Sequence, residues 1–317
     1  MDRIRWIDFL RGIAMITILI FHTECYYKEY DVTPYYIYTT NTIILFYFIS
    51  GYLFFKNSVF DFKHKFNNIF RSMVVPYFFF TTLMAYPKII LHHNNTSWQE
   101  ILIMIITGRA SWFIISLIVA ELIFTSLLLI KNNKQIWFVI ISFLCFIIYF
   151  IIPFNKYNFW QWQDALLVIP FLSLGFTYHK YEKVCTALTK TPYLFILIPI
   201  LIGIKIYEIH FDLPMRNIAI DNALLFLSDS LIFLLIVIIL IRFIPANKYI
   251  EWTGSHCIVY YFLCGGCPFI ITILLNKIGF VYNGCFYRFF IAFFLSYALI
   301  TVFTKIIYKY IPFILGK

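Results

Sequence analysis

The chain has 317 residues, of which 62% are hydrophobic and only 13% charged, and its mean hydropathy is +0.85. This composition excludes a soluble globular protein and indicates an integral membrane protein. The net charge of +10 does not point to nucleic acid as a partner, because the basic residues are distributed as in a membrane protein, mostly between apolar segments.

Apolar segments of helix length recur along the whole chain. They predict an all-α, polytopic helical bundle in the lipid bilayer, whereas a barrel would show alternating segments of about ten residues. We expect about ten transmembrane helices in a single membrane-embedded domain over residues 1–317. The expected spans are 8–27, 40–56, 69–91, 111–130, 136–152, 164–178, 193–208, 222–243, 256–275 and 286–310.

The charges between these spans set their orientation. Most of the basic residues fall on the side that also holds both chain ends, including Arg3, Arg5 and Lys317. The positive-inside rule assigns that side to the cytoplasm, so both termini are predicted to be cytoplasmic. The first apolar segment lacks a small-residue cleavage site, and we expect it to be a permanent span rather than a signal peptide.

The first apolar segment, RWIDFLRGIAMITILIFH, carries Arg11 and His22 at membrane depth. At about 100° per residue the two positions return to nearly the same helical face, and the rise of 1.5 Å per residue separates them by about 16 Å. Ionisable groups are costly there unless they face a polar interior, so the pair is a candidate functional site. The alternatives are that Arg11 reaches the nearby interface and that His22 is a packed core histidine.

The second span contains FYFISGYLFF, in which Ser50 and Gly51 interrupt an aromatic run. Glycine permits the close approach of a helix or a ligand, and serine donates a hydrogen bond. The pair therefore suits the wall of a site, and plain helix packing explains it equally well.

The next connection, KHKFNNIFRSMVVPYFFF, gathers Lys63, Lys65 and Arg71. Clustered cations suit the phosphates of an anionic cofactor, and arginine can hold a phosphate through two hydrogen bonds. For the two lysines the positive-inside rule alone is the simpler explanation.

Two acidic residues lie deep in later spans, Glu121 in SWFIISLIVAELIF and Asp229 in the eighth span. A carboxylate near an imidazole orients it and supports its protonated form, so we expect one of the two to partner His22. Lys205 either neutralises the other carboxylate or extends to the outer interface.

Seven cysteines are scattered along the chain and imply no disulfide framework. Cys264 and Cys267 have the spacing of a redox motif, but the small residues between them and Pro268 more simply mark a break in the ninth span. His92 and His93 fall in a predicted external loop, and as sequence neighbours their side chains diverge, so no metal site is expected.

Several of these motifs together resemble the acyltransferase 3 family of membrane proteins, with its glycan O-acetylase branch as the nearest likeness. They are RGIAMITILIFH with Arg11 and His22, FYFISGYLFF, Arg71 five residues before Pro76, and SWFIISL. The matches lie in the first 125 residues. The family's late motif often ends in Tyr-Leu-x-His, whereas GSHCIVYYFLC ends in Cys264, so a contribution from that histidine is absent or moved.

The resemblance implies a ten-helix bundle that takes an acyl group, usually acetyl, from cytoplasmic acyl-CoA and places it on an extracytoplasmic sugar hydroxyl. It also implies that Arg11 and His22 are the essential pair. We expect His22, Arg11 and Glu121 to be catalytic, and Arg11, Arg71, Ser50 and Gly51 to contact the donor, acetyl-CoA. His22 would act either as a general base or as a transient acyl carrier.

The resulting hypothesis is an acyl-CoA-dependent O-acyltransferase of the plasma membrane, the inner membrane of a bacterium. Its acceptor would be a surface polysaccharide or a lipid-linked precursor. Two alternatives use the same residues: a transporter or flippase whose path the buried charges line, and a sensor or scaffold with a degenerate acyltransferase fold.

Overall fold

The computed structural model describes residues 4–28, 35–55, 61–92, 97–129, 136–155, 158–245 and 247–316. Throughout these ranges the regular structure is helical, and the only extended pairing found in them is an isolated bridge between Met215 and Ile220. The predicted all-α class is confirmed.

Most predicted spans coincide with one α-helix. The third, 69–91, covers a short π-helix and the α-helix that follows it, and the ninth covers two consecutive α-helices. The α-helices are α1 (Arg5–Tyr27), α2 (Tyr35–Phe54), α3 (Phe62–Ile69), α4 (Val75–His92), α5 (Trp98–Ile106), α6 (Trp112–Leu127), α7 (Ile136–Ile151), α8 (Trp162–Lys180), α9 (Glu182–Leu188), α10 (Leu194–Phe211), α11 (Ala223–Leu240), α12 (Lys248–Ser255), α13 (Cys257–Leu263), α14 (Gly266–Lys277) and α15 (Phe286–Tyr310). A short π-helix, η1 (Phe70–Val74), joins α3 to α4.

Five of the described helical segments are long and apolar enough to cross a membrane. They are Arg5–Tyr27, Ile37–Phe54, Thr191–Phe211, Ala223–Phe243 and Phe286–Tyr310, and the pair α13 and α14 makes a sixth if it is one bent span. The 47° bend between α13 and α14 confirms the break predicted around Gly265 and Pro268. The total of about ten spans and the cytoplasmic termini stay predictions.

The chain forms two compact units. The first comprises residues 1–43, 205–210 and 240–312, and the second comprises residues 44–204, 211–239 and 313–317. Each unit combines segments that are far apart in the sequence, so neither corresponds to a simple half of the chain.

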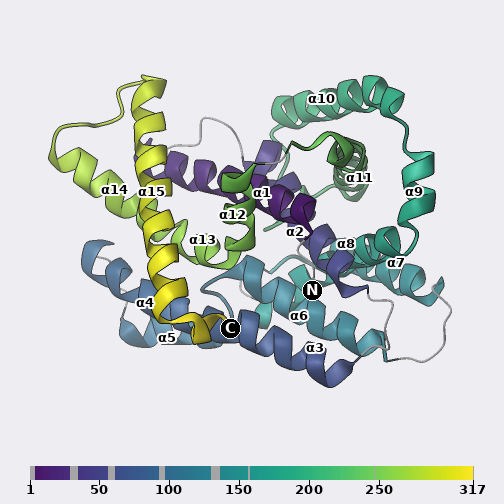
Figure 1. Ribbon diagram of the computed structural model, residues 1–317, viewed down its shortest axis with the longest axis horizontal. Helices are drawn as coiled ribbons and strands as arrows, with labels where there is room; N and C mark the ends of the chain where they lie inside the picture. The colour runs from purple at the N-terminus through teal and green to yellow at the C-terminus, as the bar shows by residue number, and fades with distance from the viewer. Residues whose placement is uncertain are drawn as a thin grey trace. The chain divides into compact units, whose positions relative to one another are not determined.

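In the first unit α1 lies against α12, with α13, α14 and α15 also packed on it (Figure 1). Glycines on both helices allow this contact. A Cβ placed on Gly12 would stand 2.1 Å from the carbonyl oxygen of Ile250, and one placed on Gly254 would stand 1.7 Å from that of Asp8. The backbones of α1 and α12 therefore touch directly beside Arg11, and this contact fixes the position of that residue's backbone.

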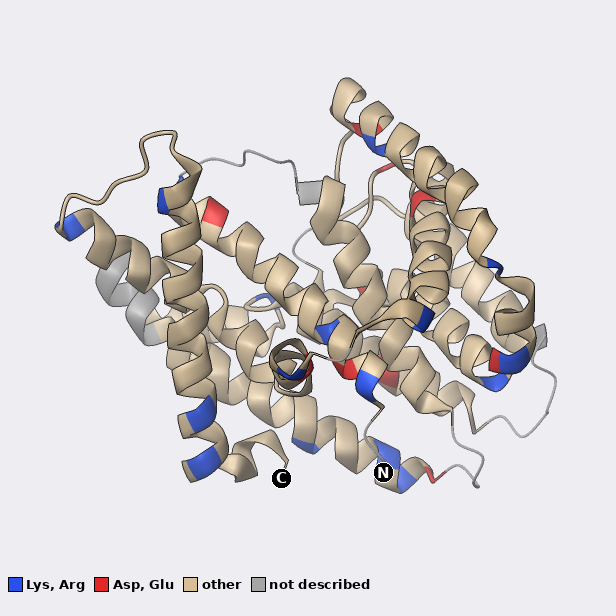
Figure 2. Ribbon diagram, turned by 45° about the horizontal axis from the view of Figure 1, so that its top comes forward, with Lys and Arg blue, Asp and Glu red and all other residues tan. Residues whose placement is uncertain are grey.

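The longest helix of the first unit, α15, carries basic residues at both ends and none along its middle (Figure 2). This pattern is typical of a membrane-spanning helix, because lysine and arginine reach the interfaces while the apolar middle stays in the bilayer.

In the second unit α8 packs between α6 and α7, and α3 packs on α6. Aromatic rings fill the space between these helices. The ring of Phe124 lies 5.2 Å from that of Phe54 and 5.8 Å from that of Phe176, with edge-to-face geometry in both contacts. This core holds α2, α6 and α8 together at the level of Glu121.

Candidate active site

Arg11 and His22 lie on one unbroken helix, α1, which keeps them on nearly the same face. Both residues are half-buried. Arg11 and Asp8 are close enough to Cys257 of α13 to interact with it electrostatically. The face that carries the pair is thus turned at least partly into the first unit.

The neighbourhood of His22 is aromatic on one side. Its ring contacts that of Phe21 at 5.7 Å, and Phe21 contacts Tyr38 of α2 at 6.3 Å. The hydroxyl of Tyr38 donates a hydrogen bond of 3.2 Å to Glu24. The His22 ring thus packs on Phe21, Phe21 packs on Tyr38, and Tyr38 binds the buried carboxylate of Glu24 on the same helix as His22.

That carboxylate is neutralised by Lys28, whose Nζ lies 3.4 Å from Glu24 Oε1. Only 2% of the Lys28 side chain is exposed, and its ammonium group lies over the rings of Tyr282, Phe286 and Phe289 at 4.7 to 5.3 Å. Cation–π contacts of this kind stabilise a desolvated ammonium group. The C-terminal end of α1 is thereby fixed to α15.

In the second unit Glu121 is buried, accepts one hydrogen bond and forms one ion pair. The hydroxyl of Ser50 donates to Glu121 Oε1, and Lys65 Nζ lies 3.3 Å from Glu121 Oε2. The same ammonium group lies 3.6 Å from the centre of the Phe54 ring. Ser50 of α2, Lys65 of α3 and Glu121 of α6 thus form one polar cluster in an aromatic surrounding.

Gly51, next to Ser50, is covered by a neighbouring helix. A Cβ on Gly51 would stand 2.0 Å from the carbonyl oxygen of Leu172 on α8. Gly51 therefore allows the backbone of α8 to approach closely. A contact between Gly51 and the donor stays a prediction.

Arg71 lies in the π-helix η1 and is exposed. π-Helical turns are rare and often mark functional sites. Gly316 packs against the backbone of Arg71, with a closest approach of 3.1 Å for a Cβ, and the adjacent Ile314 and Leu315 are buried. The backbone that carries Arg71 is held in place, while its guanidinium is accessible to an anionic ligand.

A family model described as an acyltransferase domain matches residues 4–310, which is nearly the whole chain. The chain belongs to the acyltransferase 3 family. No curated protein and no solved structure matches it. Membership of this family identifies the protein as a membrane acyltransferase, in agreement with the resemblance of its motifs.

In this acyltransferase the residues singled out by sequence are divided between the two units. Arg11 and His22 belong to the first, whereas Ser50, Arg71 and Glu121 belong to the second. The pairing of His22 with a carboxylate of another span stays a prediction for Glu121 and likewise for Asp229, which is buried in α11.

Lys205 has two partners that the sequence analysis did not single out, and its pairing with Glu121 or Asp229 stays a prediction. Its Nζ forms an ion pair of 3.0 Å with Glu208, one turn along α10, and donates to Asn41 at 3.4 Å. The Glu24 and Lys28 pair was also not singled out, although the i, i+4 spacing of opposite charges is a readable signal. Lys65 as the partner of Glu121 had no such signal, because 56 positions separate them in the chain.

The cysteines of this acyltransferase show no disulfide among the residues described. Cys264 and Cys267 are buried at the break between α13 and α14, and the Cys264 thiol donates to the carbonyl of Tyr261 at 2.9 Å. In the described part of the chain no cluster of histidine, cysteine and acidic residues could hold a metal ion.

Proposed function

We propose that this acyltransferase moves an acyl group, acetyl by preference, from cytoplasmic acyl-CoA to a hydroxyl of a surface polysaccharide or its lipid-linked precursor. It would act in the plasma membrane, the inner membrane of a bacterium, as a glycan O-acetylase. The family match supports acyl transfer. Arg11 and His22 of α1 support acyl-CoA as the donor and transfer from the cytoplasmic side.

The observation that carries the proposal is the placement of Arg11 and His22 on one half-buried face of α1. CoA is anionic at one end and carries its thioester at the far end of a flexible arm. The rise of about 16 Å between the two residues is of the same order as that arm. Arg11, together with the exposed Arg71, would hold the charged end, and His22 would lie at the thioester.

The reaction needs a proton acceptor for the acceptor hydroxyl. The hydroxyl oxygen attacks the thioester carbon, the carbon–sulfur bond breaks, and the hydroxyl proton passes by way of His22 to the CoA thiolate. In the alternative, the imidazole attacks first and carries the acyl group until the hydroxyl displaces it. A carboxylate, Glu121 or Asp229, would stabilise the imidazolium in either case.

The test uses the purified protein in lipid vesicles with acetyl-CoA and, as the acceptor, a polysaccharide that bears free hydroxyls, and it measures free CoA with a thiol reagent. We expect CoA release that is lost in His22→Ala and kept in His210→Ala, which removes an exposed histidine of α10 at no proposed site. Mass and proton spectra of the surface glycan from cells with and without the protein would show the added acyl group.

Other results would favour the alternatives. Movement of a solute across the vesicle membrane without any CoA release supports a transporter. Full CoA release by His22→Ala, at normal abundance of the variant, refutes the catalytic assignment.

A further inference from the structure

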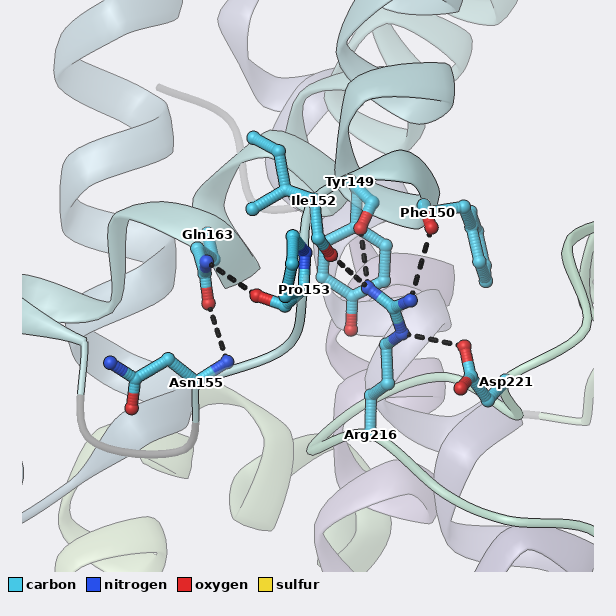
Figure 3. Close-up of polar contacts among 8 residues, drawn as sticks. All are labelled: Tyr149, Phe150, Ile152, Pro153, Asn155, Gln163, Arg216 and Asp221. Carbon is cyan, nitrogen blue, oxygen red and sulfur yellow. Dashed lines mark hydrogen bonds and ion pairs between the residues drawn. The ribbon is translucent and has the colours of Figure 1, made fainter.

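Two arginines at helix ends differ in how far the fold satisfies them. Arg216, in the loop before α11, donates to three carbonyl groups at the end of α7 and pairs with Asp221 at 2.7 Å (Figure 3). Because the last carbonyl groups of a helix have no partner within it, Arg216 closes the end of α7 and serves the fold. Arg5, the first residue of α1, is placed differently, because it borders a cavity.

This cavity lies in the first unit, where α1, α12 and the segment after α11 meet. Its volume is about 250 Å³. Its wall combines two charged side chains, one indole ring and three aliphatic side chains, from Arg5, Trp6, Ile241, Ile244, Pro245 and Glu251. All six residues belong to the same unit, and none of them takes part in the acyl transfer proposed above.

Two candidate membrane spans end at the cavity. One begins at Arg5, and the other, Ala223–Phe243, ends one residue before Ile244. Phe243 and Tyr249, close to the lining residues in the sequence, are exposed aromatic rings of the kind found where helices leave the bilayer. The cavity therefore lies at the depth where the headgroups of phospholipids meet their acyl chains.

Arg5 and Glu251 give the cavity one positive and one negative group. Arg5 Nη2 lies 3.1 Å from Glu251 Oε1, and Arg5 Nε lies 3.3 Å from Glu251 Oε2. These contacts use two of the five N–H groups of the guanidinium, and each carboxylate oxygen can accept more than one hydrogen bond. The Arg5 side chain is 65% exposed, so the ion pair alone adds little stability.

We propose that this cavity binds the headgroup of a phospholipid whose amine is ethanolamine. The phosphate would accept hydrogen bonds from Arg5, which can hold it through two N–H groups. The ammonium group would donate to Glu251 and lie against the Trp6 ring in a cation–π contact. Both charges of the headgroup are thereby matched, and the aliphatic part of the wall contacts the glycerol and the first carbons of the acyl chains.

The two charges select this lipid over its relatives. Glu251 repels a headgroup whose only charge is the phosphate, such as that of phosphatidylglycerol. Phosphatidylcholine carries its positive charge on a nitrogen that has three methyl groups and no N–H to donate. Of the three headgroups, only ethanolamine offers a phosphate to Arg5 and a donor to the carboxylate.

The cavity is separate from the donor site. At about 100° per residue, Arg5 and Arg11 are about 120° apart around α1, and the contacts of α12 with Asp8 and Gly12 fall between them. Cavities that enclose a drug-sized molecule are roughly 300–1,000 Å³, so the volume found here suits a headgroup better than a nucleotide. The inference therefore stands apart from the proposed function.

The test measures how lipids shift the melting temperature of the detergent-purified protein. The probes are phosphatidylethanolamine, phosphatidylcholine and phosphatidylglycerol with the same acyl chains, and native mass spectrometry counts the bound lipid. A ligand that binds only the folded protein stabilises it by mass action, so phosphatidylethanolamine at ten times its Kd should raise the melting temperature by about 3–6 °C. We expect one retained phosphatidylethanolamine and smaller shifts with the other two lipids.

Two variants separate the charges. In Glu251→Gln the shift with phosphatidylethanolamine should fall to the level of phosphatidylcholine, and in Arg5→Gln the shifts with all three lipids should fall. The control Lys277→Gln removes an exposed cation in the last turn of α14 and should keep the wild-type shifts. Each shift is measured against the same variant without lipid, so a purely structural loss lowers both melting temperatures and leaves their difference unchanged.

Three results would overturn the inference. Equal shifts with the three lipids in the wild-type protein mean that the cavity selects no headgroup. Unchanged shifts in both variants mean that the lipid binds elsewhere. Displacement of phosphatidylethanolamine by acetyl-CoA assigns the cavity to the nucleotide end of the donor instead.

Discussion

Replacing Gly12 by alanine tests the packing that positions Arg11. A Cβ on Gly12 would stand 2.1 Å from Ile250 O, whereas real Cβ contacts essentially never close below 3.0 Å. The obstacle is a backbone carbonyl, which cannot rotate away, so α1 and α12 must separate by about 0.9 Å. Such overpacking costs about 1–3 kcal/mol. The higher helix propensity of alanine offsets about 1 kcal/mol of this.

Because the approach is far below contact distance, we expect the upper part of this range and a net loss of about 2 kcal/mol. The assay is thermal melting of the purified protein, in which each kcal/mol corresponds to about 2–4 °C. The same displacement moves Arg11, so the KM for acetyl-CoA should rise more than kcat falls. A suitable control is Gly203→Ala in α10, where nothing lies within 4 Å of the added Cβ and melting should be equal or higher.

The reasoning would be refuted if Gly12→Ala melted at or above the wild-type temperature. Agreement of the two alanine variants in melting temperature would mean that α1 and α12 do not touch backbone to backbone. A lower melting temperature with an unchanged KM would support the packing and remove its link to donor binding.

Three further outcomes follow from the buried charges. Lys65→Met leaves the Glu121 carboxylate without its cation and should lower the melting temperature, whereas the double variant with Glu121→Gln should recover most of the loss. Lys28→Met should behave in the same way, with recovery on adding Glu24→Gln, and a double variant that melts as low as the single one would contradict the pairing. Arg216→Lys keeps the charge but loses the planar fork that serves three carbonyl groups, so faster amide exchange is expected at the end of α7, and unchanged exchange would show that the contacts are dispensable.

Sequence patterns located the helices well because apolar runs of this length have few other structures available in a membrane. The last span was predicted at 286–310 and α15 is Phe286–Tyr310. The break in the ninth span was readable because glycine and proline act locally. The same holds for Arg11 and His22, whose common face follows from helix geometry alone.

Contacts between distant segments could not be predicted from the sequence. Nothing in the spacing of Lys65 and Glu121 connects them, because the contact depends on how α3 packs on α6. The π-helical turn at Arg71 likewise depends on its surroundings, since residues 313–316 cover it from the far end of the chain. At Gly51 the sequence allowed a ligand or a helix, and the choice of α8 required the packed structure.

Three lysines that are buried or half-buried are each paired with a carboxylate of their own unit. Lys28 pairs with Glu24, Lys65 with Glu121, and Lys205 with Glu208, so these cations are already compensated. Arg11 differs, since no ion pair is found for it among the residues described, although it is half-buried on a span. A cation at membrane depth that lacks a carboxylate partner gains most from an anion supplied by a ligand. The anionic end of acyl-CoA, the proposed donor, is such a ligand, and its binding would give Arg11 the counter-charge that Lys28, Lys65 and Lys205 obtain from carboxylates.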